Sequence, residues 1–502
     1  MANPLKRLAG ETVIYGMSTI LARMINFFFV PIYTRILSQD GYGAYSEIMS
    51  YIAVLQVALV LGLETGCFRF ANKVKEVERP FSNAFVTVFG LSLALFLAVL
   101  LFNGEIASLM GYQGYGTMII YVGGIMLLDA STAILFARLR YYRKAFKFAL
   151  LKSIKILSEL GFNLLLFFGA PAYFAAHPDS LLLHFIPAQA DFSYIIFAVL
   201  LSCILCTLLF IPDLLRMRFA IDPKLWRSMM LYSLPIMIAG LPGIVNESLD
   251  RILFRFYAPD ALSWRAELGI YQAAVKLAVI MNLFIQMFRY AAEPFFFARN
   301  REKGSGELYA KVMEYFVAFC MLIFLGVTLY IDLIGLILGK DFRGAMGTVP
   351  FMLISYMLLG MLFNVSMWYK LSGQTKYAIN ITLAGLAVTA AVNILFMPLF
   401  SYWASVAAHL LSVMVMLLYS LKLGNKYYPI PYRWRRIMAN IALGVLLMLL
   451  AQGADYCLER LAGEVPMALK LALNTLFIAA YMLFCYLYNF KRNKAYSYNY
   501  EG

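Results

Sequence analysis

The chain has 502 residues, of which 63% are hydrophobic and only 14% are charged, and its formal net charge is +15. A soluble protein of this composition would expose large apolar patches and aggregate, so the composition excludes an ordinary soluble domain. The basic residues are spread over many short connections rather than clustered, which argues against nucleic-acid binding and is typical of a membrane protein.

Apolar stretches about as long as a bilayer crossing follow one another along the chain. A spanning helix needs about 20 apolar residues at a rise of 1.5 Å each. The first stretch is too long and too aromatic for a cleaved signal peptide, so we expect it to be retained. We predict an all-α integral membrane protein of about 14 transmembrane helices, at residues 11–37, 44–71, 83–102, 116–137, 149–170, 192–212, 229–257, 268–297, 312–338, 349–371, 377–397, 401–421, 437–453 and 467–489.

The distribution of Lys and Arg among the connections predicts the orientation. With the N-terminus in the cytoplasm, 29 of these residues fall in the cytoplasmic connections and termini, and 7 fall on the opposite side. Cytoplasmic loops carry the excess of basic residues in membrane proteins. We therefore expect both termini to be cytoplasmic, and we expect no large domain outside the membrane.

An internal repeat relates the first two predicted helices to the seventh and eighth. Residues 34–37 (TRIL) align with residues 250–253 (DRIL), and 42–45 (YGAY) align with 268–271 (LGIY). Two halves of equal topology that hold cargo between them are a common transporter plan. We predict a six-helix lobe over residues 1–220, a second six-helix lobe over 221–430, and two additional helices with a cytoplasmic tail over 431–502.

The sequence carries no pattern of residues typical of an enzyme. The three His residues are scattered, there is no Walker, HExxH or GxSxG motif, and no cofactor or metal site is expected. Cys203 and Cys206 have redox spacing but lie in an apolar run, where we interpret them as two small helix residues. Without a nucleotide-binding domain, energy must come from an ion gradient, the membrane potential or the gradient of the cargo.

Charged residues inside the apolar stretches are therefore the main functional signal. Arg23 lies about 18 Å into the first predicted helix, near the bilayer midplane, and has no acidic residue one turn away. Lys276 is similarly isolated in the eighth helix. Both residues are candidates for an anion-binding cavity. The alternative is that each pairs with Glu64, Asp129 or another acid on a neighbouring helix.

Other intramembrane charges have a partner at helical spacing. Opposite charges four residues apart share one face of a helix. We predict three such pairs, which are Lys155 with Glu159, Arg289 with Glu293, and Glu247 with Arg251.

Arg35, Arg251 and Arg255 lie near the predicted outer ends of the first and seventh helices. Arg251 and Arg255 share one helix face, and two guanidinium groups can bind a diphosphate through paired hydrogen bonds. Interfacial anchoring is an equal alternative for these three residues.

Prolines interrupt several predicted helices. Proline removes one backbone hydrogen bond and bends a helix, and bends at repeat-equivalent positions suit a moving gate. The alternative is that proline is simply common in membrane helices. The positions are Pro31, Pro235, Pro242 and Pro294.

Five segments resemble the polysaccharide flippases of the Wzx type, within the superfamily that also contains multidrug extruders and lipid II flippases. They are PIYTRILSQDGYGAY (31–45), LGLETGCFRFANK (61–73), LPIMIAGLPGIVNESLDRILF (234–254), GIYQAAVKLA (269–278) and WYKLSGQTKY (368–377). The resemblance implies twelve to fourteen helices in two lobes that open alternately to each side. It also implies that an undecaprenyl-diphosphate-linked oligosaccharide is moved across the bacterial cytoplasmic membrane for O-antigen, capsule or exopolysaccharide synthesis.

On this interpretation Arg23, Lys276, Arg35, Arg251 and Arg255 bind the substrate, and Glu64 and Asp129 are candidates for coupling to a proton or a sodium ion. Partners are the lipid-linked oligosaccharide, membrane lipid, and a polysaccharide polymerase with its assembly proteins. Two alternatives stay open: a multidrug-extruder-type antiporter, and a membrane polysaccharide polymerase or ligase, which would need a larger outer loop.

Overall fold

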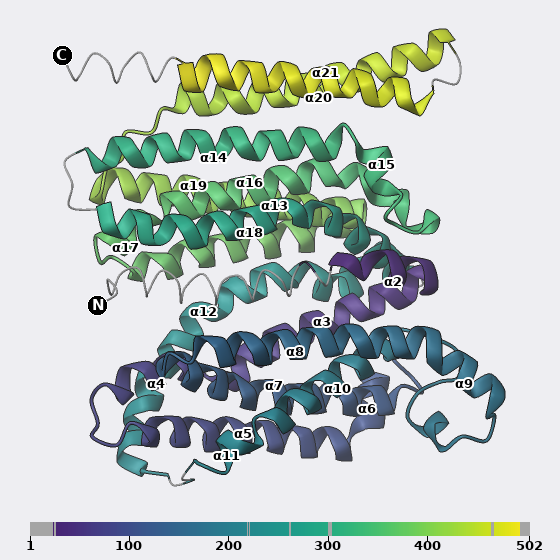
Figure 1. Ribbon diagram of the computed structural model, residues 1–502, viewed down its shortest axis with the longest axis vertical. Helices are drawn as coiled ribbons and strands as arrows, with labels where there is room; N and C mark the ends of the chain where they lie inside the picture. The colour runs from purple at the N-terminus through teal and green to yellow at the C-terminus, as the bar shows by residue number, and fades with distance from the viewer. Residues whose placement is uncertain are drawn as a thin grey trace. The chain divides into compact units, whose positions relative to one another are not determined.

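The structure, a computed structural model, is built from helices (Figure 1). It describes residues 24, 27–217, 219, 221–260, 263–299, 304–462 and 466–491. Within these ranges all regular secondary structure is helical and no strand occurs. Twelve of the described helical segments are long and apolar enough to cross a membrane. The predicted all-α membrane fold is confirmed.

The helices coincide with the predicted apolar stretches. Each stretch from 44–71 onward overlaps one of the twelve segments, except 192–212, where the helix Ser193–Leu209 is shorter. The first stretch, 11–37, lies largely outside the described residues, and its described end forms helix α2 (Val30–Ile36). Hydrophobic length alone therefore located these helices, because the bilayer thickness sets the length that a spanning helix needs.

The chain divides into two compact units, Met1–Gly269 and Ile270–Gly502. In the first unit α12 packs along α3, α4 and α5, α5 packs on α7, and α10 packs on α7 and α8. The predicted lobe boundary between residues 220 and 221 rests on the internal repeat, not on compactness. It stays a prediction. The further helices of the first unit are α3 (Gln39–Val60), α4 (Leu63–Ala71), α5 (Glu78–Leu101), α6 (Asn103–Leu109), α7 (Gly116–Tyr141), α8 (Ala145–Leu164), α9 (Ala170–Ala176), α10 (Ser193–Leu209), α11 (Ile211–Leu214), α12 (Pro223–Tyr257) and the start of α13 (Trp264–Arg299).

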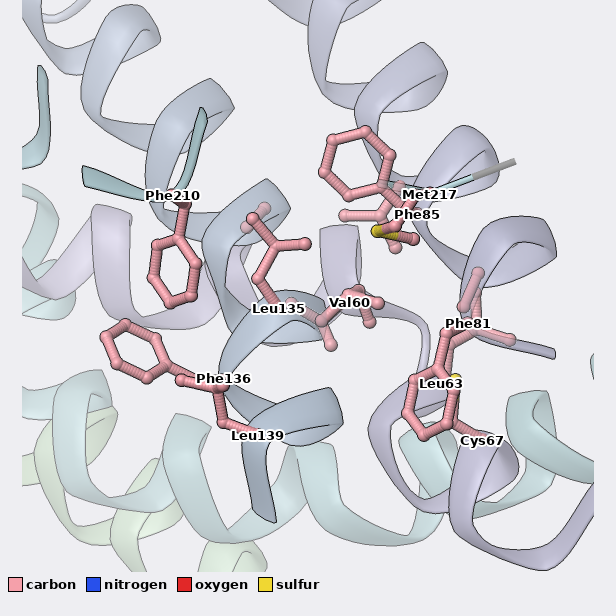
Figure 2. Packing of buried hydrophobic residues seen from close by; sticks show 14 of the residues in the cluster. Val60, Leu63, Cys67, Phe81, Phe85, Leu135, Phe136, Leu139, Phe210 and Met217 are labelled. Atoms are coloured by element: carbon pink, nitrogen blue, oxygen red, sulfur yellow. The ribbon is translucent and has the colours of Figure 1, made fainter. Parts of the chain in front are cut away.

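Aliphatic side chains and several phenylalanines pack together in the core of the first unit (Figure 2). Phe136 of α7 makes edge-to-face contacts with Phe148 and Phe210, with ring centroids 5.2 and 4.9 Å apart. Phe81 of α5 is fully buried in the same cluster. Such edge-to-face pairs add about 0.5–1.5 kcal/mol each beyond the area they bury. They fix the position of α7, which carries Asp129.

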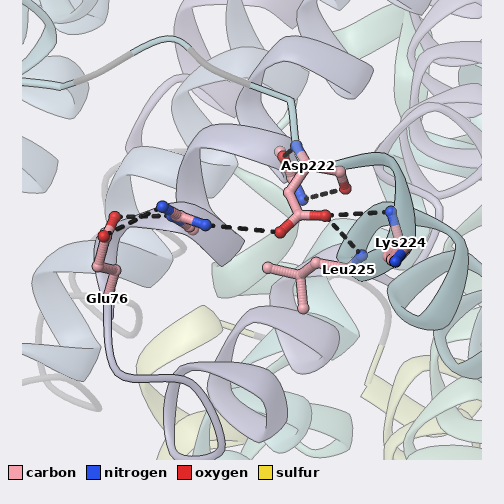
Figure 3. A network of polar contacts seen from close by, with 6 residues as sticks. Glu76, Asp222, Lys224 and Leu225 are labelled. Carbon is pink, nitrogen blue, oxygen red and sulfur yellow. Dashed lines mark hydrogen bonds and ion pairs between the residues drawn. The ribbon is translucent and has the colours of Figure 1, made fainter.

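The start of α12 is held by a polar network (Figure 3). Asp222 caps the helix, because its carboxylate accepts hydrogen bonds from the backbone N–H groups of Lys224 and Leu225 at 3.1 and 3.2 Å. Arg79 lies 3.6 Å from the same carboxylate and also binds Glu76 at 2.7 Å. The network ties α12 to the segment before α5.

The second predicted helix is broken in its middle. Leu61 and Gly62 both have left-handed backbone conformations, with φ of 55° and 67°. A side chain on Gly62 would lie 2.7 Å from the carbonyl oxygen of Ser233. Only a glycine at position 62 allows α12 to approach this closely. The contacted residue, Ser233, lies two residues before Pro235, a proline inside α12.

The second unit holds the rest of α13 and the C-terminal helices. Helices α18 and α16 pack on α19, and α20 and α21 lie side by side with α14 next to them (Figure 1). Glu314 of α14 is fully buried and pairs with Arg433 and Arg436 at 3.6 and 3.3 Å. The helices are α14 (Ser305–Thr328), α15 (Ile331–Gly335), α16 (Val349–Val365), α17 (Met367–Leu371), α18 (Lys376–Phe400), α19 (Tyr402–Tyr427), α20 (Trp434–Ala462) and α21 (Met467–Phe484).

Candidate functional site

A buried carboxylate in α3 organises one end of the first unit. Glu47 is fully buried, and Tyr112, in the loop after α6, donates a hydrogen bond to its Oε2 at 2.5 Å. The Nε of Arg265, at the start of α13, lies 3.9 Å from the same oxygen. Burial, followed by the charge of Glu47, raises the pKa of Tyr112 well above its ordinary value, so the phenol keeps its proton and stays a donor.

Arg265 also binds the loop before α7. Its guanidinium stacks on the Tyr112 ring at 4.3 Å, and Nη2 donates to the carbonyl oxygen of Gly111 at 2.9 Å. Gly111 has φ of 68°, a left-handed conformation that favours glycine, and this conformation shapes the turn. Arg255 of α12 donates from Nη2 to the carbonyl oxygen of Leu109 in the same region. We call Arg251, Arg255 and Arg265 the outer arginine cluster, after their predicted side of the membrane.

Arg251 is the least satisfied member of this cluster. It is half-buried on α12, and its Nη1 makes one long hydrogen bond, 3.4 Å, to Ser50 of α3. Its Nε is buried and has no hydrogen-bond partner among the residues that the structure describes. The predicted pair with Glu247 does not form between these two described residues, because Glu247 is exposed and Arg251 turns towards α3 instead.

The remaining predicted substrate-binding residues lie in different parts of the chain. Arg23 is outside the described residues. Arg35 is exposed on α2 and donates to the carbonyl oxygen of Pro31 at 2.8 Å, within its own helix. Lys276 is half-buried on α13 and belongs to the second unit. Their roles in binding stay predictions.

The two predicted ion-coupling acids both have basic partners. Glu64 of α4 pairs with Arg140 of α7, and Asp129 of α7 pairs with Lys155 of α8. The prediction that Lys155 pairs with Glu159 on its own helix is therefore wrong. A carboxylate on the neighbouring helix is within reach of the lysine, and spacing along one helix cannot reveal it.

Sequence reasoning missed several polar residues of the first unit. The carboxylate of Glu159 makes no hydrogen bond or ion pair with a residue that the structure describes, although Asn163 donates to its backbone carbonyl at 2.8 Å. Cys203, predicted to be a small helix residue, is buried and free, and its Sγ donates to Asp129 at 3.5 Å. Glu47 escaped notice because two of its partners, Tyr112 and Arg265, are distant in sequence, although Tyr51 on the same helix also donates to it at 3.3 Å.

Together the apolar helices and the intramembrane charges define a multi-pass membrane protein. The family described as "Polysaccharide biosynthesis protein" matches residues 8–299, more than half of the chain, and the chain belongs to this family. Searched against curated proteins, the sequence has no match.

Solved transporter structures share the fold. The lipid II flippase MurJ in an inward closed conformation is similar with a TM-score of 0.69 and 12% identity, over 94% of this chain and 99% of that one. An inward-facing multidrug resistance MATE family transporter of the MOP superfamily gives a TM-score of 0.53 and 13% identity, over 84% and 99%. At these identities the likeness shows the fold, which is that of the MOP-superfamily transporters.

Proposed function

We propose that the protein flips a lipid-diphosphate-linked oligosaccharide, the repeat unit of a surface polysaccharide, across the bacterial cytoplasmic membrane. Membership of the polysaccharide biosynthesis family supports the cargo class, and the transporter fold supports movement rather than chemistry. The observation that carries the proposal is the state of Arg251, whose guanidinium has one weak protein contact and a buried Nε without a partner.

A phosphate group suits such a guanidinium. Arginine presents five N–H donors in a fixed fork that matches the oxygens of phosphate, and charge-assisted hydrogen bonds of this kind are strong. A buried donor without a partner is costly, so a ligand that supplies the acceptor recovers that cost on binding. Arg255, one turn along α12, provides a second guanidinium on the same helix.

The membrane potential supplies a driving force for an anionic headgroup. Moving one charge across the full potential yields about 2.3 kcal/mol per 100 mV. Two diphosphate charges moving outward therefore gain roughly 4–5 kcal/mol per 100 mV when the inside is negative. Alternating access without ATP hydrolysis then suffices, and a proton or sodium ion that binds at Glu64 or Asp129 would reset the empty carrier.

The test is transport in vesicles that contain the purified protein and a fluorescent lipid-diphosphate-linked oligosaccharide. We expect accumulation in the outer-equivalent leaflet to rise with a potassium-diffusion potential, without nucleotide. Arg251→Gln should slow transport roughly ten- to a hundredfold, the worth of a charge-assisted hydrogen bond of about 1.5–3 kcal/mol. Arg460→Gln, an exposed arginine on the same predicted side, is the matched control. Unimpaired transport by Arg251→Gln, or dependence on ATP, would contradict the proposal.

The carboxylate of Glu159, which is unpaired among the described residues, supports a second candidate function, a multidrug-extruder-type antiporter. An extruder of organic cations needs a carboxylate that is available to a cation or a proton, and the carboxylate of Glu159 is available in this sense among the described residues. The same vesicles distinguish the two functions. Efflux of ethidium that is driven by a proton gradient and abolished by Glu159→Gln would support the extruder, whereas no efflux would exclude it.

A further inference from the structure

The second unit contains a small cavity with charged lining residues, and none of the predicted site residues lines it. The cavity has a volume of about 80 Å³ and lies between α13, α16 and α17. Arg289 and Glu293 of α13, Phe363 and Asn364 of α16, and Lys370 of α17 are among its lining residues. We call these five residues the Lys370 pocket. Lys370 belongs to a connection that the basic residues predict to be cytoplasmic.

The two cations of the Lys370 pocket share one carboxylate unequally. Lys370 Nζ lies 2.6 Å from Glu293 Oε1 and forms a hydrogen bond. Arg289 Nε lies 3.8 Å from Glu293 Oε2, within range of an ion pair but beyond hydrogen-bond distance. The predicted pair of Arg289 with Glu293 therefore exists, but only as a loose contact.

The N–H donors of the Arg289 guanidinium therefore make no hydrogen bond to the described residues. A guanidinium carries five N–H groups, and no residue in the described part of the chain accepts a hydrogen bond from Arg289. Its Cζ lies 4.6 Å from the centre of the Phe363 ring, which holds the guanidinium flat beside the cavity. Because the side chain is 47% exposed, a ligand can reach it.

The size and the wall of the cavity restrict the ligand. The cavity of about 80 Å³ has room for a compact group such as one phosphoryl group. Two cations against one carboxylate leave a formal charge of +1, which favours an anion.

We propose that the Lys370 pocket binds a phosphate ester, with Arg289 and Lys370 as the phosphate ligands and Glu293 as a competing internal anion. The physiological source that we assign, the phosphate nearest the sugar of a lipid-linked oligosaccharide before it crosses the membrane, rests on the proposed function. Soluble sugar phosphates offer the same chemistry. In both cases Glu293 occupies the donors of Lys370 until the ligand phosphate replaces it.

The test is binding of two probes, farnesyl diphosphate and inorganic pyrophosphate, to the purified full-length protein by calorimetry. Titration in the Arg251→Gln background removes the contribution of Arg251, the least satisfied member of the outer arginine cluster. Arg289→Gln and Lys370→Gln should each weaken binding about tenfold, whereas Arg435→Gln, an exposed arginine on the same predicted side, should not. Glu293→Gln should tighten binding several-fold, because it removes the competing charge.

Tighter binding by Glu293→Gln together with weaker binding by Arg289→Gln cannot arise from misfolding alone. Monodisperse elution of each variant in size-exclusion chromatography checks the fold. Absence of binding to the Arg251→Gln protein, unchanged affinity in both cation variants, or weaker binding in Glu293→Gln would overturn the proposal. Binding of farnesyl diphosphate alone assigns the pocket to a lipid headgroup, and equal binding of pyrophosphate assigns it to soluble phosphates. Failure of vesicle transport with the binding differences intact would reject the proposed function and leave the phosphate subsite standing.

Discussion

The backbones of Gly43 and Gly269, two residues that align in the predicted internal repeat, lie in close contact. A side chain on Gly43 would lie 1.9 Å from the carbonyl oxygen of Arg265, and one on Gly269 would lie 2.0 Å from that of Gln39. Each Cβ would also lie 3.0–3.1 Å from the backbone nitrogen of the other glycine. The contact is reciprocal, because each glycine leaves room for the backbone around the other. It lies inside the first unit.

Alanine at either glycine should force α3 and the start of α13 apart. We expect Gly43→Ala and Gly269→Ala each to lower the free energy of unfolding by about 1–3 kcal/mol, the usual cost of overpacking. Thermal unfolding in detergent measures the effect. Gly90→Ala on α5 is the control, since a side chain there meets nothing within 4 Å. Equal midpoints for all three variants would show that the contact is dispensable.

The partly buried pair of Asp129 and Lys155 should behave as an ion pair shielded from water. Lys155→Met leaves a carboxylate without its counter-charge, and we expect a loss of about 3–5 kcal/mol. Adding Asp129→Leu should restore most of that loss, because two apolar residues replace two charges. A double-mutant cycle on chemical unfolding gives the coupling free energy. Glu76→Gln, at an exposed pair, should leave the unfolding midpoint unchanged. Additive effects of the two substitutions would refute the coupling.

Tyr112 should make stability depend on alkaline pH. Burial raises the pKa of Tyr112 above its ordinary value of 10.0. The neutral phenol therefore stabilises the fold fully below pH 10, and this contribution disappears as the pH rises through the raised pKa. Tyr112→Phe should lose about 1.5–3 kcal/mol at neutral pH, the worth of a hydrogen bond to a carboxylate. Its unfolding midpoint should fall less steeply above pH 10 than that of the unchanged protein.

The control for the alkaline titration is Tyr456→Phe, because Tyr456 is 62% exposed. This variant should reproduce the pH profile of the unchanged protein. Parallel profiles for Tyr112→Phe and the unchanged protein would mean that Tyr112 does not contribute to the alkaline dependence.

The predicted orientation can be tested by reporter fusions. Fusions after Gly114 and Ser180 should report the outer side, and fusions after Lys144 and Gly502 the cytoplasmic side, because basic connections stay inside. A periplasmic phosphatase and a cytoplasmic fluorescent protein give opposite signals at each site. An outer signal at Gly502 would mean an odd number of crossings.

The sequence by itself determined the helical membrane fold and the approximate positions of most helices, although helix ends differ by up to ten residues, as between the predicted 312–338 and the observed Ser305–Thr328. Hydrocarbon thickness imposes a fixed apolar length on every crossing, and this constraint is local, so it is visible in each stretch separately. The alignment of Tyr42-Gly43 with Leu268-Gly269 predicted an internal repeat, but the close contact of the two glycines is visible only in the tertiary structure.

Only the tertiary structure decided which charge meets which. Lys155 lies one turn from Glu159 in sequence but pairs with Asp129 on another helix, and Lys370 pairs with Glu293, 77 residues away. An ion pair in the membrane depends on which helix faces which and on how each is rotated, and spacing along one helix carries no information about either. The partnerships of Glu47 with Tyr112 and Arg265 were hidden from the sequence for the same reason.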